Sequence, residues 1–209
     1  MDELEDLEIG VINLNDLIDT HLPDPPTLEF YRGLKNREIV WNGEIDDTLV
    51  DIGTYIRRWN KEDAGVPVES RKPIKLFINS DGGTVDAAMN LINIIEVSKT
   101  PVLTVGLGRV YSAGGLLLMA GYKRYIFKDT TCLIHDGSSG AIGSIGKLMD
   151  SLEFTRKLEE RMKQYIISRT KITSAMYDKN YRKDWFLFSD EMIKLGIADE
   201  IITDLDVLA

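Results

Sequence analysis

The chain has 209 residues, of which 44% are hydrophobic and 28% charged, and its formal net charge is −9. This composition predicts a globular protein with one buried core, and the acidic balance argues against a nucleic-acid-binding protein and against adhesion to anionic membranes. No apolar run approaches the roughly 20 residues of a membrane-spanning helix, and the single cysteine, Cys132, allows no internal disulfide, so we expect a cytoplasmic protein.

The chain divides into an arm and one domain. Residues 1–26 are acidic and apolar by turns and end in a proline-rich turn, which predicts a flexible N-terminal arm. Residues 27–205 are expected to form a single domain in which strands and helices alternate. The predicted strands are 37–43, 74–79, 102–105, 124–127 and 130–134, and the predicted helices are 49–59, 85–95, 112–120 and 147–169. This alternation indicates an α/β fold with a largely parallel sheet.

Two junctions between a predicted strand and a predicted helix carry residues suited to chemistry. Gly82-Gly83 let a substrate approach the backbone, whose N–H groups can face an anion, although a tight turn without function would use the same glycines. Ser112 stands at the next junction, where the helix N-terminus favours negative charge and the N–H of Ala113 is placed to bind an oxyanion. A structural N-cap is the alternative role for Ser112.

A histidine follows the last of these predicted strands. His135 comes directly before a glycine- and serine-rich loop, so its ring can face a cleft and accept a proton from a serine. The alternative is a half-buried histidine that is bonded to the backbone. Cys132 is a weaker candidate nucleophile, because it lies three residues away on the same strand and should point to the opposite face, into the core.

Taken together, these segments resemble the proteolytic subunit of the ATP-dependent Clp protease, a self-compartmentalising serine peptidase. The matching motifs are NGEIDD (42–47), FINSDGG (77–83), YSAG (111–114), LIH (133–135), KDWFL (183–187) and GIAD (196–199). The resemblance implies the fold that these subunits share with crotonases, built from repeated ββα units around a largely parallel sheet. It also implies a protruding helix-strand handle, at about residues 137–169 here.

The resemblance also implies roles for single residues. Ser112 matches the nucleophile and His135 its general base, while Gly83 and Ala113 match the positions whose N–H groups form the oxyanion hole. The third triad position, normally aspartate, falls on Asn180, which could orient the imidazole but could not neutralise its charge. Asp178 is a second candidate for this position. No metal and no cofactor bound by the chain itself is expected.

The expected assembly is a pair of stacked heptameric rings that hydrolyse peptides inside a chamber, fed by a Clp-family ATPase that uses the ATP. Two further departures from the family pattern bear on this expectation. Asp81 replaces a proline beside the proposed oxyanion hole, and Lys75 replaces an aromatic residue of the surface on which the ATPase docks, although Phe77 keeps another. Two rival functions remain: a weak or inactive regulatory ring subunit that assembles with an active paralogue, and a crotonase-type enzyme that acts on acyl-CoA.

Overall fold

The computed structural model describes residues 23–138 and 140–208, and the chain divides into two units at residue 36. The arm predicted for residues 1–26 lies outside the described residues except for its last four. In the described part of the first unit the chain forms a helix that the sequence did not predict, α2 (Pro25–Asn36). Asp24 accepts hydrogen bonds from the backbone N–H and the hydroxyl of Thr27, and a proline occupies the first helical position. An N-cap aspartate followed by proline is a favoured helix start.

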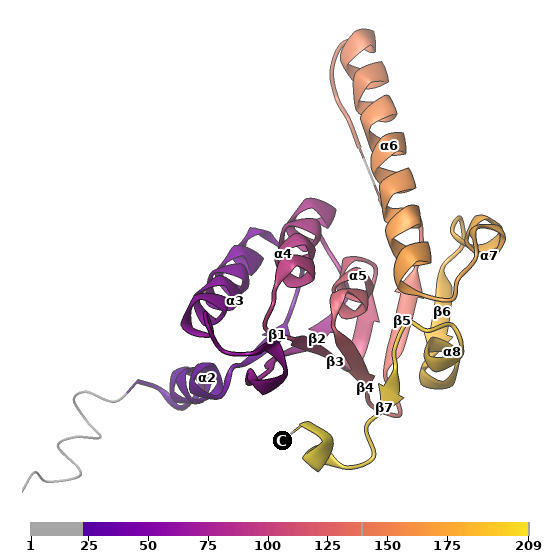
Figure 1. Cartoon of the computed structure of the whole chain (residues 1–209). Helices are drawn as coiled ribbons and strands as arrows, with labels where there is room; N and C mark the ends of the chain where they lie inside the picture. The colour runs from indigo at the N-terminus through magenta and orange to yellow at the C-terminus, as the bar shows by residue number, and fades with distance from the viewer. Residues whose placement is uncertain (1–22, 139, 209) are drawn as a thin grey trace, which may run out of the picture. The chain divides into compact units, whose positions relative to one another are not determined.

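The second unit is built on a seven-stranded sheet, shown in Figure 1. Its strands are β1 (Glu38–Asn42), β2 (Ile74–Ser80), β3 (Val102–Tyr111), β4 (Lys123–Ile126), β5 (Thr131–Ile134), β6 (Trp185–Phe188) and β7 (Glu200–Ile201). The order is β1-β2-β3-β4-β7, with β5 pairing to both β3 and β6. Every pairing is parallel except that of β5 with β6. The α/β fold with a largely parallel sheet is therefore confirmed.

Three helices lie on one face of this sheet in Figure 1, namely α3 (Val50–Glu62), α4 (Val85–Val97) and α5 (Ala113–Ala120). Every residue of α5 is buried, which explains why its sequence is apolar all round rather than amphipathic. The remaining helices of the described ranges are α6 (Ile145–Arg169), α7 (Ser174–Asn180) and α8 (Ser189–Lys194), and the short 3₁₀ turns are 47–49, 68–70 and 205–208. None of the helices in the described ranges is both long and apolar enough to cross a membrane.

Strand β3 is longer than predicted and has two neighbours on the same side. Its first half pairs with β4, from Leu103 to Gly106, and its last three residues pair with β5, where Tyr111 lies opposite Leu133. On its other side the register against β2 shifts after Ile78. Because β3 continues past β4, its carboxyl end is placed between the ends of β2 and β5. This is the edge at which the candidate site forms.

Helix α6 projects beyond the rest of its unit in Figure 1, and the segment before it runs back alongside it as a loop. Its described side chains are largely exposed, and only Tyr165 and Ile166 are buried. The Tyr165 hydroxyl donates to the carbonyl of Leu116 at 3.0 Å. The Arg169 guanidinium donates to the carbonyls of Met119, Ala120 and Gly121. Helix α6 is therefore anchored at its C-terminal end, on the C-terminal turn of α5.

Candidate active site

Ser112 occupies the sharp turn between β3 and α5 and has an unusual backbone. Its φ of 51° and ψ of −120° place a non-glycine residue in the left-handed half of conformational space, which costs about 1–3 kcal/mol. The surrounding hydrogen bonds hold it there: its N–H donates to the carbonyl of Leu133 at 2.8 Å, and its carbonyl accepts from Gly115 and Leu116. Strained backbone of this kind collects at functional sites, where a side chain must be presented from a tight turn.

The glycine pair that follows β2 lies against this turn. Gly82 has a φ of 104°, and a Cβ on it would lie 2.8 Å from the Cβ of Ser112 and 2.9 Å from the carbonyl oxygen of Tyr111. Gly83 has a φ of 144°, and a Cβ on it would lie 2.3 Å from the carbonyl oxygen of Ile45. Neither position could carry a side chain without moving the backbone. The two glycines therefore allow the ends of β2 and β3 to approach each other closely.

Ser112, Gly83 and His135 open into one cleft of about 610 Å³. His135 follows β5 directly, and its side chain is 24% exposed. The N–H of Ala113 belongs to the first turn of α5, where backbone donors lack partners inside the helix. The structure thus brings together at one edge of the sheet the serine, the histidine and both backbone positions that the sequence singled out.

A smaller apolar pocket of about 50 Å³ adjoins the same two side chains. Besides Ser112 and His135 it is lined mainly by aliphatic and thioether side chains from α4, α5, β5 and α6: Val85, Leu116, Met119, Leu133, Ile134, Met162 and Ile166. A pocket of this composition accepts an apolar group and offers little to a charged one.

The cleft carries more negative than positive charge. Asp81, Asp86, Asp136 and Glu159 all line it. Asp81, which stands beside the glycine pair, is held by Arg109: the guanidinium Nε lies 2.8 Å from a carboxylate oxygen. Both side chains are more than half exposed, so the pair is partly screened by solvent. The charge that Asp81 brings to the glycine turn is therefore partly compensated by its neighbour.

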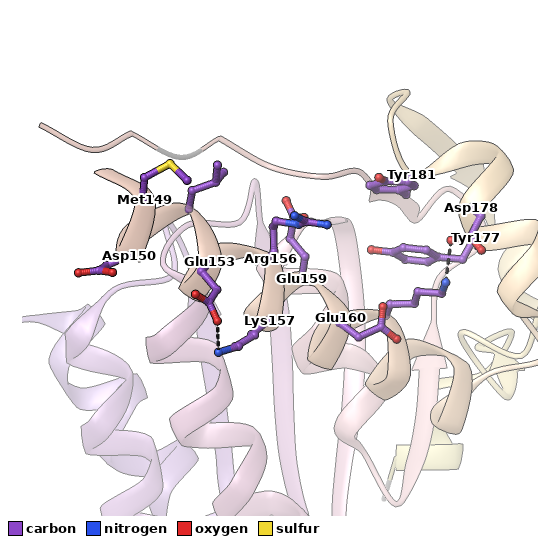
Figure 2. A pocket seen from close by; sticks show the side chains of 12 residues that line it. Met149, Asp150, Glu153, Arg156, Lys157, Glu159, Glu160, Tyr177, Asp178 and Tyr181 are labelled. Carbon is purple, nitrogen blue, oxygen red and sulfur yellow. Dashed lines mark hydrogen bonds and ion pairs between the residues drawn. The ribbon is translucent and has the colours of Figure 1, made fainter. Parts of the chain in front are cut away.

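Both candidates for the third triad position are hydrogen-bonded to groups other than His135. The Asn180 amide donates to the carbonyl of Met176 at 2.9 Å, within its own helix. Asp178 pairs with Lys163 at 2.7 Å, and the hydrogen bond from this lysine lowers the pKa of its carboxyl. Figure 2 shows Asp178 next to Tyr177 on α7, at the side of a separate pocket between α6 and α7. The role assigned to Asn180 therefore stays a prediction from the sequence.

A different carboxylate lies beside His135. One oxygen of Asp184 is 3.6 Å from the Nδ1 atom of His135, and the Asp184 side chain is 68% exposed. Asp184 belongs to the KDWFL motif, for which the sequence predicts no catalytic role. The signal that could have identified it is structural: the antiparallel register of β5 and β6, which no local pattern in the sequence reveals.

Cys132 is fully buried, and burial raises the pKa of its thiol to about 12. A thiol that stays protonated at neutral pH is a poor nucleophile. The prediction that Cys132 packs in the core is confirmed. Within the described ranges, no three histidine, cysteine or acidic side chains are grouped so that they could hold a metal ion.

Comparison with known proteins agrees with this geometry. The model of the Clp protease family matches residues 29–204. The chain is also 28% identical over 184 residues to the ATP-dependent Clp protease proteolytic subunit 2 of Treponema pallidum (strain Nichols), a match that covers 87% of this chain and 90% of that protein. The family match spans β1 to β7 and contains every residue of the cleft described above. The chain belongs to the Clp protease family, a family of peptidases.

Proposed function

We propose that this chain is a serine endopeptidase in which Ser112 is the nucleophile and His135 the general base. The Oγ atom of Ser112 attacks the peptide carbonyl while His135 accepts its proton, and the N–H groups of Gly83 and Ala113 bind the oxyanion. His135 then donates the proton to the leaving amine as the C–N bond breaks. Water, deprotonated by His135, attacks the acyl-enzyme ester, which releases the peptide acid and restores the Ser112 hydroxyl.

The backbone of Ser112 is the observation that carries this proposal. A structural N-cap would need no left-handed conformation, because an ordinary N-cap has extended backbone angles. At φ 51° the chain keeps a strained serine that opens into the same cleft as a histidine. A site that only stabilised the fold would have no reason to retain this strain, whereas a nucleophile at a tight turn explains it.

The pocket beside Ser112 supports a preference for substrates with an apolar side chain next to the scissile bond. Its walls are apolar and it adjoins both reacting side chains, so we expect it to take the side chain on the acyl side of the scissile bond. Aliphatic and thioether side chains are favoured in it, and carboxylates are disfavoured because the surrounding cleft is already acidic.

The exposed part of α6 supports assembly into larger particles. The Clp protease family implies oligomers and, in general, an ATPase partner. Five large apolar side chains of α6 and of the loop before it are each more than half exposed to solvent: Ile142, Ile145, Met149, Leu152 and Phe154. Such a surface is expected to be covered by other copies of the chain. We infer stacked heptameric rings in which this handle meets its counterpart.

Docking of an ATPase partner rests on other features of the chain than peptide hydrolysis does. The Treponema relative is a subunit of an ATP-dependent protease, which is a property of that protein. In this chain Lys75 is buried and its ammonium lies 3.1 Å from a carboxylate oxygen of Glu38, directly across the β1–β2 register. A paired lysine offers less to an apolar docking segment than an aromatic ring would. Docking of a Clp-family ATPase is therefore proposed as a separate property from peptide hydrolysis.

A regulatory subunit with weak or no activity is the second candidate function. It is favoured by Asn180, since an amide at that position cannot neutralise the imidazolium as a carboxylate would. The retention of Ser112 and His135 in one cleft favours the first candidate, because a purely structural subunit has no chemical need for either.

A crotonase-type enzyme that acts on acyl-CoA is disfavoured by the charge of the cleft. The cleft is acidic, whereas the phosphates of CoA require a basic site.

The test is covalent labelling of the purified chain with a fluorophosphonate, followed by intact-mass measurement. We expect one adduct on the parent chain and none on Ser112→Ala or His135→Ala, together with hydrolysis of an unstructured peptide that both variants lose. Equal hydrolysis by the parent and by Ser112→Ala would overturn the proposal. An unlabelled, inactive parent that nevertheless assembles with an active homologue would establish the regulatory candidate instead.

A further inference from the structure

We propose that the cleft around Ser112 selects basic peptides, in which a lysine or an arginine stands next to the apolar residue at the scissile bond. The inference rests on the proposed function and deepens it, because it names the substrate class of the same site. Ser112 and His135 make this cleft a substrate site, and the carboxylates around them determine which peptides are preferred. The two main determinants are Asp136 and Glu159.

The carboxylates that line the cleft come from separate segments of the chain. They are Asp81 after β2, Asp86 in the first turn of α4, Asp136 directly after His135, and Glu159 on α6. Among the described residues that line the cleft, none is a lysine or an arginine. A bound peptide therefore meets negative charge from several elements, and the lining itself supplies no basic side chain to balance it.

Three of these carboxylates have no close basic partner. Asp81 is held by Arg109, but Asp86, Asp136 and Glu159 form no ion pair with any basic group in residues 23–138 and 140–208. Asp86 and Asp136 are exposed, and Glu159 is half-buried. Their charges are therefore available to a ligand, and Glu159 is the least screened by solvent of the three.

Two groups near the cleft respond to the charges of Asp136 and Glu159. Burial is the main reason why the pKa of Tyr177 is raised to about 12, and Glu159 and Asp136 contribute to the increase. The hydrogen bond to Tyr181 raises the pKa of Arg182, and the same two carboxylates add to that effect. Because Asp136 and Glu159 act on the same groups, their charges combine in one region, and Tyr177 lines the apolar pocket there. A cation that a peptide carries into this region would be stabilised in the same way.

The basic side chains of α6 and of the turn after α7 are engaged elsewhere. The Nε atom of Arg182 donates to the Tyr181 hydroxyl at 2.8 Å, and Lys163 pairs with a carboxylate of α7 at 2.7 Å. Arg156, one turn before Glu159 on α6, lines the separate pocket between α6 and α7, where Figure 2 shows it. The carboxylates of the cleft therefore remain for a cation that the substrate supplies.

Asp136 connects the acidic cleft with the apolar pocket, because it lines both. A peptide that places an apolar side chain in the pocket brings the neighbouring side chain into the cleft. Lysine and arginine suit the cleft, since their apolar stems can lie along Phe154 and Leu158 while the charged head reaches a carboxylate. Within the described ranges these carboxylates are not grouped so that they could hold a metal ion, which makes the cation of a side chain the matching ligand.

The experiment compares fluorogenic peptides that share a leucine on the acyl side of the scissile bond and carry lysine, glutamine or glutamate next to it. For the full-length chain we expect kcat/KM to be about 4- to 20-fold higher with lysine than with glutamine, and lowest with glutamate. Added salt should reduce this preference. Asp136→Asn and Glu159→Gln should each lower the lysine-to-glutamine ratio about 2- to 5-fold. Asp51→Asn, at an exposed carboxylate of α3 outside the cleft, is the matched control and should leave the ratio unchanged.

The ratio of two peptides isolates specificity from catalysis. An effect of Asp136→Asn on the neighbouring His135 is common to both peptides and cancels in the ratio. Equal turnover of the lysine and glutamine peptides by the parent would overturn the inference while leaving a fluorophosphonate-labelled Ser112 intact. An unchanged ratio in the double variant Asp136→Asn with Glu159→Gln would do the same.

Peptide binding separates this inference from the proposed function. Fluorescence anisotropy with Ser112→Ala, which cannot form the acyl-enzyme, should show the tightest binding for the lysine peptide and the weakest for the glutamate peptide. An unlabelled, inactive parent that still prefers the lysine peptide, with the preference lost on substitution of Asp136 and Glu159, would overturn the proposed function and support the inference. An unlabelled parent that binds none of the peptides would overturn both.

Discussion

Helices α5 and α6 are consecutive in the chain, but α5 is buried and α6 is largely exposed. Every side chain of α5 is buried, whereas α6 is three times as long and buries only two residues. Both carry large apolar residues, but α5 is apolar all round, whereas in α6 the apolar residues are interspersed with many charged ones. The difference shows that the sheet and its covering helices form a core complete within one chain, which fixes the strand ends around Ser112. The exposed apolar side chains of α6 lie outside this core, and we propose that other copies of the chain cover them.

The largest expected effect comes from removing a core leucine. Leu118 on α5 is fully buried, and Leu118→Ala should reduce the free energy of unfolding by about 2–5 kcal/mol, since it removes apolar contacts and leaves a cavity. Denaturant titration measures the loss. The matched substitution on α6 is Leu152→Ala, at a side chain that is 57% exposed. A loss from Leu152→Ala as large as that from Leu118→Ala, in dissociated chains, would contradict the comparison.

The second largest effect is expected from a substitution in the glycine turn, and it should lower activity rather than stability. Gly83→Ala puts a Cβ 2.3 Å from the carbonyl oxygen of Ile45 at a φ of 144°, so the backbone must move and carry its N–H away from the oxyanion. We expect kcat/KM to fall about 10²- to 10³-fold. Gly146→Ala on α6, where a Cβ would meet nothing within 4 Å, is the control and should stabilise its helix by up to about 1 kcal/mol. Parent-like hydrolysis by Gly83→Ala would remove Gly83 from the oxyanion hole.

A charge on the exposed face of α6 should act on assembly alone. Leu152→Glu adds a carboxylate to a helix on which Asp150 and Glu153 are already neighbours, so an interface between handles would have to bury it. We expect sedimentation velocity at micromolar concentration to show smaller particles, with association weakened about 10-fold or more, while far-ultraviolet circular dichroism stays unchanged. Particles of the parent's size would show that α6 is not at an interface.

The smallest expected effect concerns the Asp81–Arg109 pair. Arg109→Gln leaves the Asp81 charge uncompensated beside the glycine turn, where it repels the developing oxyanion. We expect kcat/KM to fall only about 2- to 5-fold, because both side chains are exposed, and the loss should shrink as salt is added. The double variant Arg109→Gln with Asp81→Asn should recover the parent rate. A loss that is insensitive to salt would argue for a steric rather than an electrostatic cause.

Much of the core and half of the site could be predicted from the sequence. The alternation of apolar runs located β1 to β5 and helices α3 to α5, because each run is bounded by glycine, proline or charged residues. The sequence predicts Ser112 and His135 as site residues because each follows an apolar strand at a glycine-rich junction. These are local signals, and the structure places both residues in one cleft.

The parts of the fold and of the site that the sequence does not predict depend on contacts between distant parts of the chain. The proximity of Asp184 to His135 follows from the β5–β6 register, which is set by pairing across about 50 residues and leaves no local trace. The extra length of β3 likewise depends on β5 as a neighbour, since its last three residues pair there. The sequence does not predict helix α2, because its proline-rich start is also typical of a turn, although Asp24 and Pro25 together form a helix start.

The burial of Cys132 makes the chain well suited to spectroscopic labelling. Its only native thiol lies inside the sheet and stays protonated at neutral pH, so maleimide reagents will react with it slowly while the fold is intact. A cysteine introduced at an exposed position, such as Met149 on α6, would then carry a single fluorophore without deletion of the natural residue. Energy transfer between labelled copies could follow subunit exchange directly.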